Sequence, residues 1–317
     1  MAYKATIGIE VHVELNTNSK LFSDSANCYG METNTGVNVI DLGYPGTLPT
    51  VNKQVIALGV QTAHILHCDL TKKMHFDRKN YFYPDTPKNY QITQNRTPIG
   101  RNGYLEIAVD GYQKKIEIEE FHIEEDTCKS AHRGQVSLLD FNRAGVPLIE
   151  IVTKPCIATS NEAMAYLEKL KETLFYANIS DCKMEEGSMR CDVNVSVSKT
   201  DQLGFKCEIK NIGSIHNVGI SIDKEIKRQI ALLESGETLR EETRRFDDKL
   251  QETVLMRVKE TGNDYRYFPE PDIPYIWLED DFICQVIQEI PLLPDELREK
   301  YKQLGLSDLQ INKLIAN

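Results

Sequence analysis

Three segments of the chain alternate strictly between apolar and polar residues, which is the pattern of a β-strand with one buried face. They cover residues 6–15, 188–197 and 205–211, and we expect the last two to form a hairpin. Each strand should bury its apolar row and present a row of charged and polar side chains on the other face. These polar rows are Glu10, His12 and Glu14 in the first segment, Arg190, Asp192, Asn194 and Ser196 in the second, and Lys206, Glu208 and Lys210 in the third.

Apolar residues at helical spacing predict three long helices, over residues 51–67, 161–177 and 215–235. Ser160 is the expected N-cap of the second helix, and Gly236 is a natural stop for the third. The segments between them should be strands and turns, with a second strand pair near 136–153 and Pro-rich turns over 240–275. Within residues 75–125, the turn signals are Pro84-Asp85, Arg101-Asn102-Gly103 and Asp110-Gly111.

These elements predict an α+β fold, in which a large, mostly antiparallel, cradle-like sheet carries helices on one side. Its polar face should form a concave site. We expect residues 1–292 to form this domain. Pro294 then opens a helix that stops at Gly305, and Ser307 starts another. Residues 293–317 are therefore expected to be the beginning of a helical domain that continues in a longer protein.

Composition restricts the class of protein. The chain has 317 residues and 41% hydrophobic content, and no run approaches the roughly 18 apolar residues of a membrane helix. It shows no secretory signal and no C-x-x-C pair among eight cysteines, so we expect a cytoplasmic protein with reduced thiols. The net charge of −11 means that RNA would need a local basic patch or a partner.

The candidate chemistry lies in acidic residues, because the chain lacks the glycine-rich phosphate loops and the G-x-S-x-G and H-E-x-x-H motifs. Two carboxylates around an imidazole, as in Glu10, His12 and Glu14, can hold a divalent cation. The alternative is a solvated sheet face. Glu150 lies in an apolar strand and must be paired or metal-bound. A buried salt bridge to the nearby Arg143 or Arg190 is the competing interpretation.

A second candidate feature combines basic and aromatic residues. The segment Phe76-Asp77-Arg78-Lys79-Asn80-Tyr81-Phe82-Tyr83-Pro84-Asp85 offers rings that can stack on a base and cations that can neutralise phosphates. An amphipathic edge strand followed by a Pro-Asp turn explains the same composition.

Several long motifs give the chain a specific resemblance to the GatB family, whose members belong to tRNA-dependent Asp/Glu amidotransferases. They run in order from residue 7 to residue 272 and cover most of the chain. They are IGIEVHVEL from Ile7, YPGTLP from Tyr44, FDRKNYFYPD from Phe76, IEED from Ile123, KMEEGS from Lys183, ETRRFD from Glu242 and YRYFPEPD from Tyr265.

The resemblance implies a kinase-like role. Proteins of the GatB type bind misacylated Glu-tRNA(Gln) or Asp-tRNA(Asn) and use Mg-ATP to phosphorylate the side-chain carboxylate of the attached amino acid. Ammonia from the amidase subunit GatA then displaces the phosphate, and the small subunit GatC wraps the other two. A free-standing ATP-dependent carboxylate–amine ligase and a non-catalytic scaffold module are the alternatives.

Phosphoryl transfer needs metal ions and cations, and the candidate residues suit that need. Glu125 could also accept a proton from ammonia. The expected magnesium ligands are Glu10, His12, Glu125 and Glu150. Asp192 and Asn194 should complete the shell. Lys79, Arg190 and Lys210 should neutralise the ATP phosphates. Asn194 and Glu208 also belong to the residues expected to bind the cofactor. The expected catalytic set is Glu10, His12, Lys79, Glu125 and Asp192.

The chain departs from the family at one place near its N-terminus. Many members carry paired cysteines there that bind zinc, whereas the matching positions here are Ser23, Ser25, Asn38 and Asp41. We therefore expect no zinc.

Overall fold

A nine-stranded sheet forms the centre of the computed structural model, which describes residues 2–258 and 264–315. Neighbouring strands run antiparallel, except that β12 and β13 are parallel. This mixed sheet with flanking helices confirms the α+β prediction. In spatial order the strands are β14 (Glu252–Val258), β13 (Glu242–Asp247), β12 (Cys207–Lys210), β11 (Met189–Ser198), β1 (Lys4–Glu14), β10 (Pro147–Thr153), β7 (Tyr112–Glu125), β6 (Gly100–Val109) and β2 (Asp69–Leu70).

Three smaller sheets accompany the large one. The first joins segments far apart in the sequence, because the short strand β15 pairs with β4. The first small sheet consists of β15 (Phe268–Pro269), β4 (Asp77–Asn80) and β5 (Tyr90–Thr93). The second consists of β16 (Ile276–Trp277) and β3 (Lys73–Met74), and the third of β8 (Lys129–Arg133) and β9 (Val136–Asp140).

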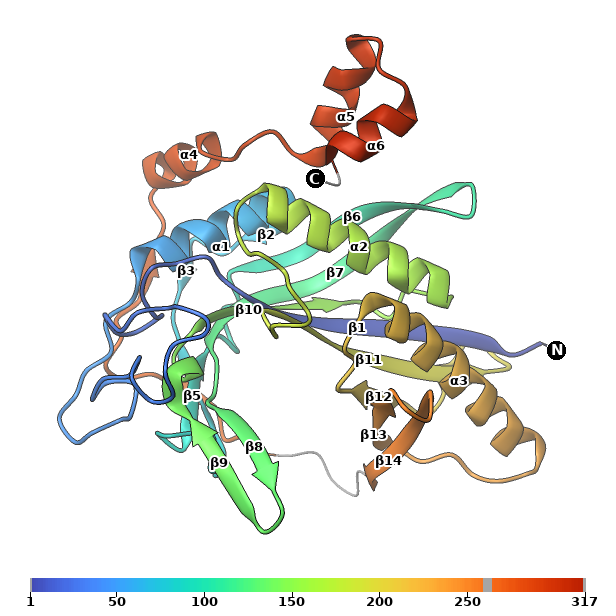
Figure 1. Cartoon of the computed structure of the whole chain (residues 1–317), viewed down its shortest axis with the longest axis horizontal. Helices are drawn as coiled ribbons and strands as arrows, with labels where there is room; N and C mark the ends of the chain where they lie inside the picture. Colours follow the sequence, from blue (N-terminus) through green and yellow to red (C-terminus); the bar gives the residue numbers. More distant parts are fainter. Residues whose placement is uncertain (1, 259–263, 316–317) are drawn as a thin grey trace.

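Helices cover one face of the large sheet, as Figure 1 shows for α1, α2 and α3. None of the helices in the described residues combines the length and apolar character that crossing a membrane requires. The helices are α1 (Lys53–Ile65), α2 (Ser160–Tyr176), α3 (Ile215–Glu234), α4 (Asp280–Gln288), α5 (Pro294–Gln303) and α6 (Asp308–Ile315), with a 3-10 turn at Phe141–Arg143.

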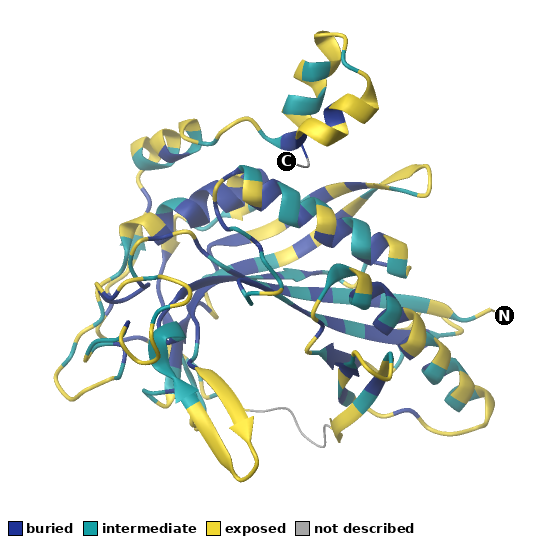
Figure 2. Ribbon diagram, viewed as in Figure 1, coloured by how far each residue is buried: buried dark blue, intermediate teal, exposed yellow. Residues whose placement is uncertain are grey.

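The apolar rows predicted from the sequence form the core under these helices (Figure 2). In β1 the apolar row from Ile7 to Leu15 is 0–2% exposed, and each such side chain contributes about 1.5–3 kcal/mol on burial. Gly59 lets α1 approach the sheet, because a Cβ there would lie 2.7 Å from Ile99 Cδ1. Burial of this face leaves the polar rows on the opposite side of the sheet.

Most predicted elements are confirmed, but three expectations were wrong in detail and one helix was missed. The N-cap of α2 is Thr159, not Ser160, and its side chain accepts a hydrogen bond from the Glu162 amide. The proposed turn at Arg101-Asn102-Gly103 lies inside β6, which keeps its pairing with β7 on both sides. The strands near 136–153 do not pair with each other: β9 pairs with β8, while β10 pairs with β1 and β7. Helix α4 was not predicted.

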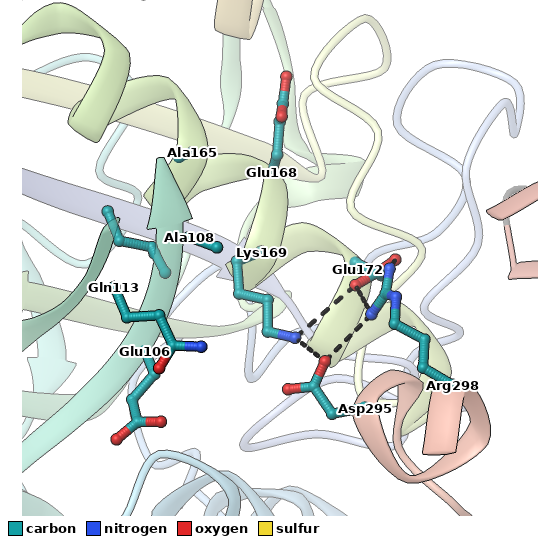
Figure 3. A pocket seen from close by; sticks show the side chains of 10 residues that line it. Glu106, Ala108, Gln113, Ala165, Glu168, Lys169, Glu172, Asp295 and Arg298 are labelled. Carbon is teal, nitrogen blue, oxygen red and sulfur yellow. Dashed lines mark hydrogen bonds and ion pairs between the residues drawn. The ribbon is translucent and has the colours of Figure 1, made fainter. Parts of the chain in front are cut away.

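An ion-pair network attaches α5 to α2 on the helical side of the molecule (Figure 3). Lys169 pairs with Asp295, and Arg298 pairs with both Glu172 and Asp295. The network borders a cavity of about 490 Å³ whose other wall includes residues of β6 and β7. This cavity lies away from the polar sheet face and holds none of the predicted site residues.

Candidate functional site

Strand register brings polar side chains from neighbouring strands into one row. His12 on β1 lies opposite Glu150 on β10, and Glu150 lies opposite His122 on β7. On the other side of β1, His12 lies opposite Arg190 on β11. Directly opposite residues have Cβ atoms about 4.5–5.5 Å apart. Four adjacent strands therefore place one guanidinium, two imidazoles and one carboxylate in a single row across the sheet.

The first acidic group centres on Glu150. Its Oε2 lies 3.4 Å from His12 Nε2 and 3.3 Å from His122 Nε2. Glu124 lies within 3.8 Å of the same two imidazole nitrogens. One carboxylate oxygen of Glu124 is buried and has no hydrogen-bond partner among the described residues. The group therefore offers ligand atoms that the protein itself does not fully satisfy.

The proximity of these groups shifts their pKa values strongly. Burial would raise the pKa of Glu150, but the two imidazoles outweigh burial and hold it well below its usual range. Burial would lower the pKa of His122, yet the nearby carboxylates of Glu124 and Glu150 outweigh burial and raise it to about 10. The pKa of His12 is raised for the same reason, mainly by Glu150. The imidazoles and the carboxylates of this group therefore favour each other's charged forms.

The second acidic group lies one row along the same sheet face. Glu10 lies opposite Asp192, and Glu208 on β12 adds a third carboxylate. Asn194 donates a hydrogen bond of 2.8 Å to Glu10 Oε1. Burial, followed by the charge of a neighbouring carboxylate, raises the pKa of Glu10. Lys210 forms ion pairs with Asp192 and with Glu208.

Cations border both acidic groups. Burial would lower the pKa of Lys79, but Glu124 and Glu150 outweigh burial and raise it. Arg190 donates a 2.7 Å hydrogen bond to Asp126. With Lys210 beside the second group, three cations surround the carboxylates. Such a set can neutralise a polyanion as well as hold metal ions.

Both acidic groups border a cavity of about 510 Å³, a volume typical of small-molecule sites. His12 and Glu124 line it from the first group and Asp192 from the second, whereas Glu10, Glu150 and Glu208 do not line it. Its floor is the polar sheet face, and loops after β12 and around β4 and β5 complete it. Residues from the predicted set that line it are His12, Lys79, Arg190, Asp192 and Lys210.

Residues 5–284 match the sequence profile of the GatB/GatE catalytic domain. The chain belongs to this family. A relative from Ligilactobacillus salivarius is 54% identical over 307 residues, which are 96% of this chain and 64% of that protein. Relatives from Levilactobacillus brevis and Lysinibacillus sphaericus are 53% and 50% identical and match over 97% and 100% of this chain. All three bear the name of the B-type subunit of an aspartyl/glutamyl-tRNA(Asn/Gln) amidotransferase.

The chain spans about two thirds of the length of these curated relatives, between 64% and 67%. The shared region therefore contains the GatB/GatE catalytic domain and omits about one third of each relative.

The four expected magnesium ligands do not converge on one point. His12 and Glu150 share the first acidic group, whereas Glu10 belongs to the second. Glu125 belongs to neither, because successive strand residues point to opposite faces. Its carboxylate accepts bonds of 2.6 Å from Lys88 Nζ and 2.8 Å from the Ile92 amide. The structure thus corrects the placement of Glu125.

The structure also changes the partners expected for Glu150. The two candidate arginines, Arg143 and Arg190, both pair with Asp126, and Glu150 pairs with the two histidines. The salt-bridge interpretation was therefore wrong about the partner, although the carboxylate is indeed paired.

Three site residues were missed by the sequence reasoning: His122, Glu124 and Asp126. Alternation in the sequence could have identified His122 and Glu124. Phe121 and Ile123 are apolar, so the residues that follow them must share the opposite, polar face of the strand. Asp126 follows the end of β7, so alternation could not place it.

The residue types suit hard divalent cations. Within residues 2–258 and 264–315, two sets of three groups place one ligand atom each within 4.8 Å of one another. One set is His12, Glu124 and Glu150, and the other is Glu10, Asp192 and Glu208. Carboxylate-rich sets with at most one imidazole suit magnesium or manganese.

The four positions at which the sequence resemblance led us to expect cysteines form a hydrogen-bonded network. Asp41 accepts bonds of 2.6 Å from the hydroxyls of both Ser23 and Ser25, and a third from the Asn38 amide. The fully buried ammonium of Lys20 lies 3.2 Å from Asp41 Oδ2. An ammonium group and two hydroxyls therefore surround Asp41.

Proposed function

We propose that the chain is the kinase-like subunit of a glutamine-dependent tRNA amidotransferase. Its substrates would be Mg-ATP and Glu-tRNA(Gln) or Asp-tRNA(Asn), and its partners an amidase subunit, GatA, and a small subunit, GatC, in the cytoplasm. One observation carries the proposal: both carboxylate-rich groups contribute residues to a single cavity, which three cations also line. The name that the relatives bear supports the tRNA substrate.

The proposed reaction has two steps. An oxygen of the amino acid's side-chain carboxylate attacks the γ-phosphorus of ATP, and ADP leaves. Ammonia then attacks the acyl carbon, phosphate leaves, and a proton is lost from nitrogen. Bound magnesium would offset the charge of the phosphates.

The protein's own side chains would align these reactants and stabilise their charge. Lys79 and Arg190 line the cavity as fixed cations and would bind phosphate oxygens. Lys210 pairs with Asp192 in the structure, and its ammonium would turn partly from Asp192 to the phosphate oxygens when ATP binds. Asn194 holds Glu10 in place through its amide.

Two residue sets would hold the magnesium ions. His12, Glu150 and Glu124 would form one site, and Glu10, Asp192 and Glu208 the other. We leave Glu125 out of both and also out of proton transfer, because its carboxylate is already held by Lys88.

We further propose that residues 1–292 form the catalytic unit and that residues 293–317 begin a helical domain. The profile match ends at residue 284, and α5 and α6 pack on each other (Figure 1).

The function is tested by ATP turnover in the complex reconstituted with the amidase and small subunits. ADP release should require misacylated tRNA, and free glutamate should not replace it. Turnover with free glutamate would indicate a free-standing carboxylate–amine ligase. Absence of metal-dependent ATP binding in calorimetry would indicate a scaffold. Glu10→Gln and His12→Ala should each abolish amidation while glutamine hydrolysis by the amidase subunit persists.

A further inference from the structure

A second cavity, rich in aromatic side chains, adjoins the candidate site. Its volume is about 610 Å³. It lies where the loop after β4 meets the segment that leads into β15, two parts of the chain that β4–β15 pairing holds together. The aromatic residues that line it are Tyr81, Phe82, Tyr83, Tyr265 and Phe268.

The two cavities share a wall. Tyr81 lines both of them. Lys79, which lines the candidate site, lies 5.2 Å above the ring of Tyr265, which lines the aromatic cavity. A ligand that occupied the aromatic cavity could therefore extend directly into the cavity with the acidic groups.

Part of the aromatic wall is rigid and part is exposed. The ring of Tyr81 packs edge-on against Tyr265, and its hydroxyl donates a 2.7 Å hydrogen bond to Gln91. In contrast, Phe82 is 78% exposed and Tyr83 is 61% exposed. Exposed rings beside a firmly held wall form a platform on which a planar group from solvent can stack.

The cavity also carries cationic charge. Arg257 and Arg266 line it, and across the part of the chain that the structure describes neither guanidinium forms an ion pair. The carboxylate in the lining, Asp264, accepts a hydrogen bond from the backbone amide of Arg266. Two guanidinium groups beside stacking rings favour a ligand with both bases and phosphates.

We propose that this cavity binds an unpaired nucleobase at the 3′ end of the substrate tRNA, stacked on Phe82 and Tyr83. The proposal rests on the proposed function, because the amino acid to be modified is esterified to that end. ATP also carries a base, but its phosphates would lie among the metal ligands in the neighbouring cavity and would leave Arg257 and Arg266 without a phosphate partner. Guanidinium groups beside the stacking rings are expected for a polynucleotide, which carries a phosphate at every base.

The test compares two RNA hairpins that share one acceptor-like stem. One ends in an unpaired CCA 3′ end and the other is blunt. Their affinities for the chain are measured by fluorescence anisotropy at low ionic strength, where phosphate contacts are least screened. The wild-type chain should prefer the unpaired end, and Phe82→Ala or Tyr83→Ala should reduce that affinity about fivefold to a hundredfold.

Controls separate stacking from general effects. Phe175 is an exposed ring on α2, on the helical side of the sheet, and Phe175→Ala should leave both affinities unchanged. Arg257→Gln should weaken binding of the unpaired end. It should also reduce the slope of log affinity against log salt concentration by about one. Mg-ATP affinity, measured by calorimetry, should be unaffected in Phe82→Ala.

Two results would overturn the proposal. Equal affinity of the wild-type chain for both hairpins would show that no unpaired base is bound. A loss of Mg-ATP affinity in Phe82→Ala, with hairpin binding intact, would assign the cavity to the base of ATP. Either result can occur while the reconstituted complex still amidates tRNA, so it would leave the proposed function standing. Failure of tRNA-dependent ATP turnover would instead refute the proposed function.

Discussion

The adjacent residues Glu124 and Glu125 provide a direct test of the site, because β7 points them to opposite faces. Each can be changed to glutamine, which keeps the shape and removes the charge. Glu124→Gln removes one ligand from the group that contains His12 and Glu150. Glu125→Gln leaves this group intact and removes the partner of Lys88 instead.

Glu124→Gln should lower the affinity for metal, whereas Glu125→Gln should lower the free energy of unfolding. Loss of a group that only supports a metal ligand lowers metal affinity about 10- to 100-fold, so loss of a direct ligand should cost at least about 100-fold. This corresponds to about 2.8 kcal/mol. In Glu125→Gln, the amide oxygen can still accept from the Ile92 amide, but the buried ammonium of Lys88 is left without its counter-charge. Breaking a buried pair in this way costs about 3–5 kcal/mol of folding free energy.

Two measurements separate these outcomes. Calorimetric titration with magnesium or manganese gives the metal affinity, and urea unfolding gives the free energy of unfolding. We expect Glu124→Gln to lose metal affinity, and Glu125→Gln to keep it but unfold at lower urea concentration. Normal metal binding by Glu124→Gln, or loss of binding in a folded Glu125→Gln protein, would refute the assignment of Glu124 to the site.

Three further predictions concern stability and metal content. Gly103→Ala should destabilise the fold by about 3 kcal/mol, because a Cβ would lie 2.5 Å from the carbonyl oxygen of Leu66, whereas Gly213→Ala, with nothing within 4 Å, should change urea unfolding little. Glu225→Gln should cost about 2 kcal/mol at pH 7, because Glu225 accepts two hydrogen bonds from Arg228. Burial would raise the pKa of Glu225, but contacts that include Arg228 outweigh burial and lower it. The ionised Glu225 side chain therefore stabilises the fold above the unfolded pKa of about 4.3, and this stabilisation is lost as pH falls through the folded pKa. The difference in stability between wild type and Glu225→Gln should accordingly shrink in acid. Elemental analysis of the purified chain should show no stoichiometric zinc, and one full equivalent would contradict this.

The alternating pattern was sufficient to predict the faces of the central strands. Ile7 and Val11 are buried, while Glu10 and His12 share the opposite face, because a strand allows only two directions. The same rule, applied to β7, would have selected Glu124. Glu125, which we expected among the magnesium ligands, follows Glu124 directly and therefore occupies the other face of the strand.

Other features depend on tertiary contacts that a local pattern does not contain. Helix α4 packs on α1, and the Gln61 side chain donates a hydrogen bond to the Val286 carbonyl. The parallel pairing of β12 with β13 requires α3 to cross between them, and no residue in either strand signals it. The hydrogen bonds from Ser23 and Ser25 to Asp41 likewise join residues that are 18 and 16 positions apart, and no local sequence pattern predicts them.

Register explains why neighbours on one strand belong to different acidic groups. Glu10 and His12 are two residues apart on the same face of β1, and the sequence alone places them in one site. In the sheet, β10 contributes Glu150 beside His12, whereas β11 contributes Asp192 beside Glu10. Each acidic side chain therefore takes its partners from across the sheet. It follows that substitution of Asp192 should weaken the second group while leaving the geometry of the first intact, so the two groups can be examined separately by metal titration.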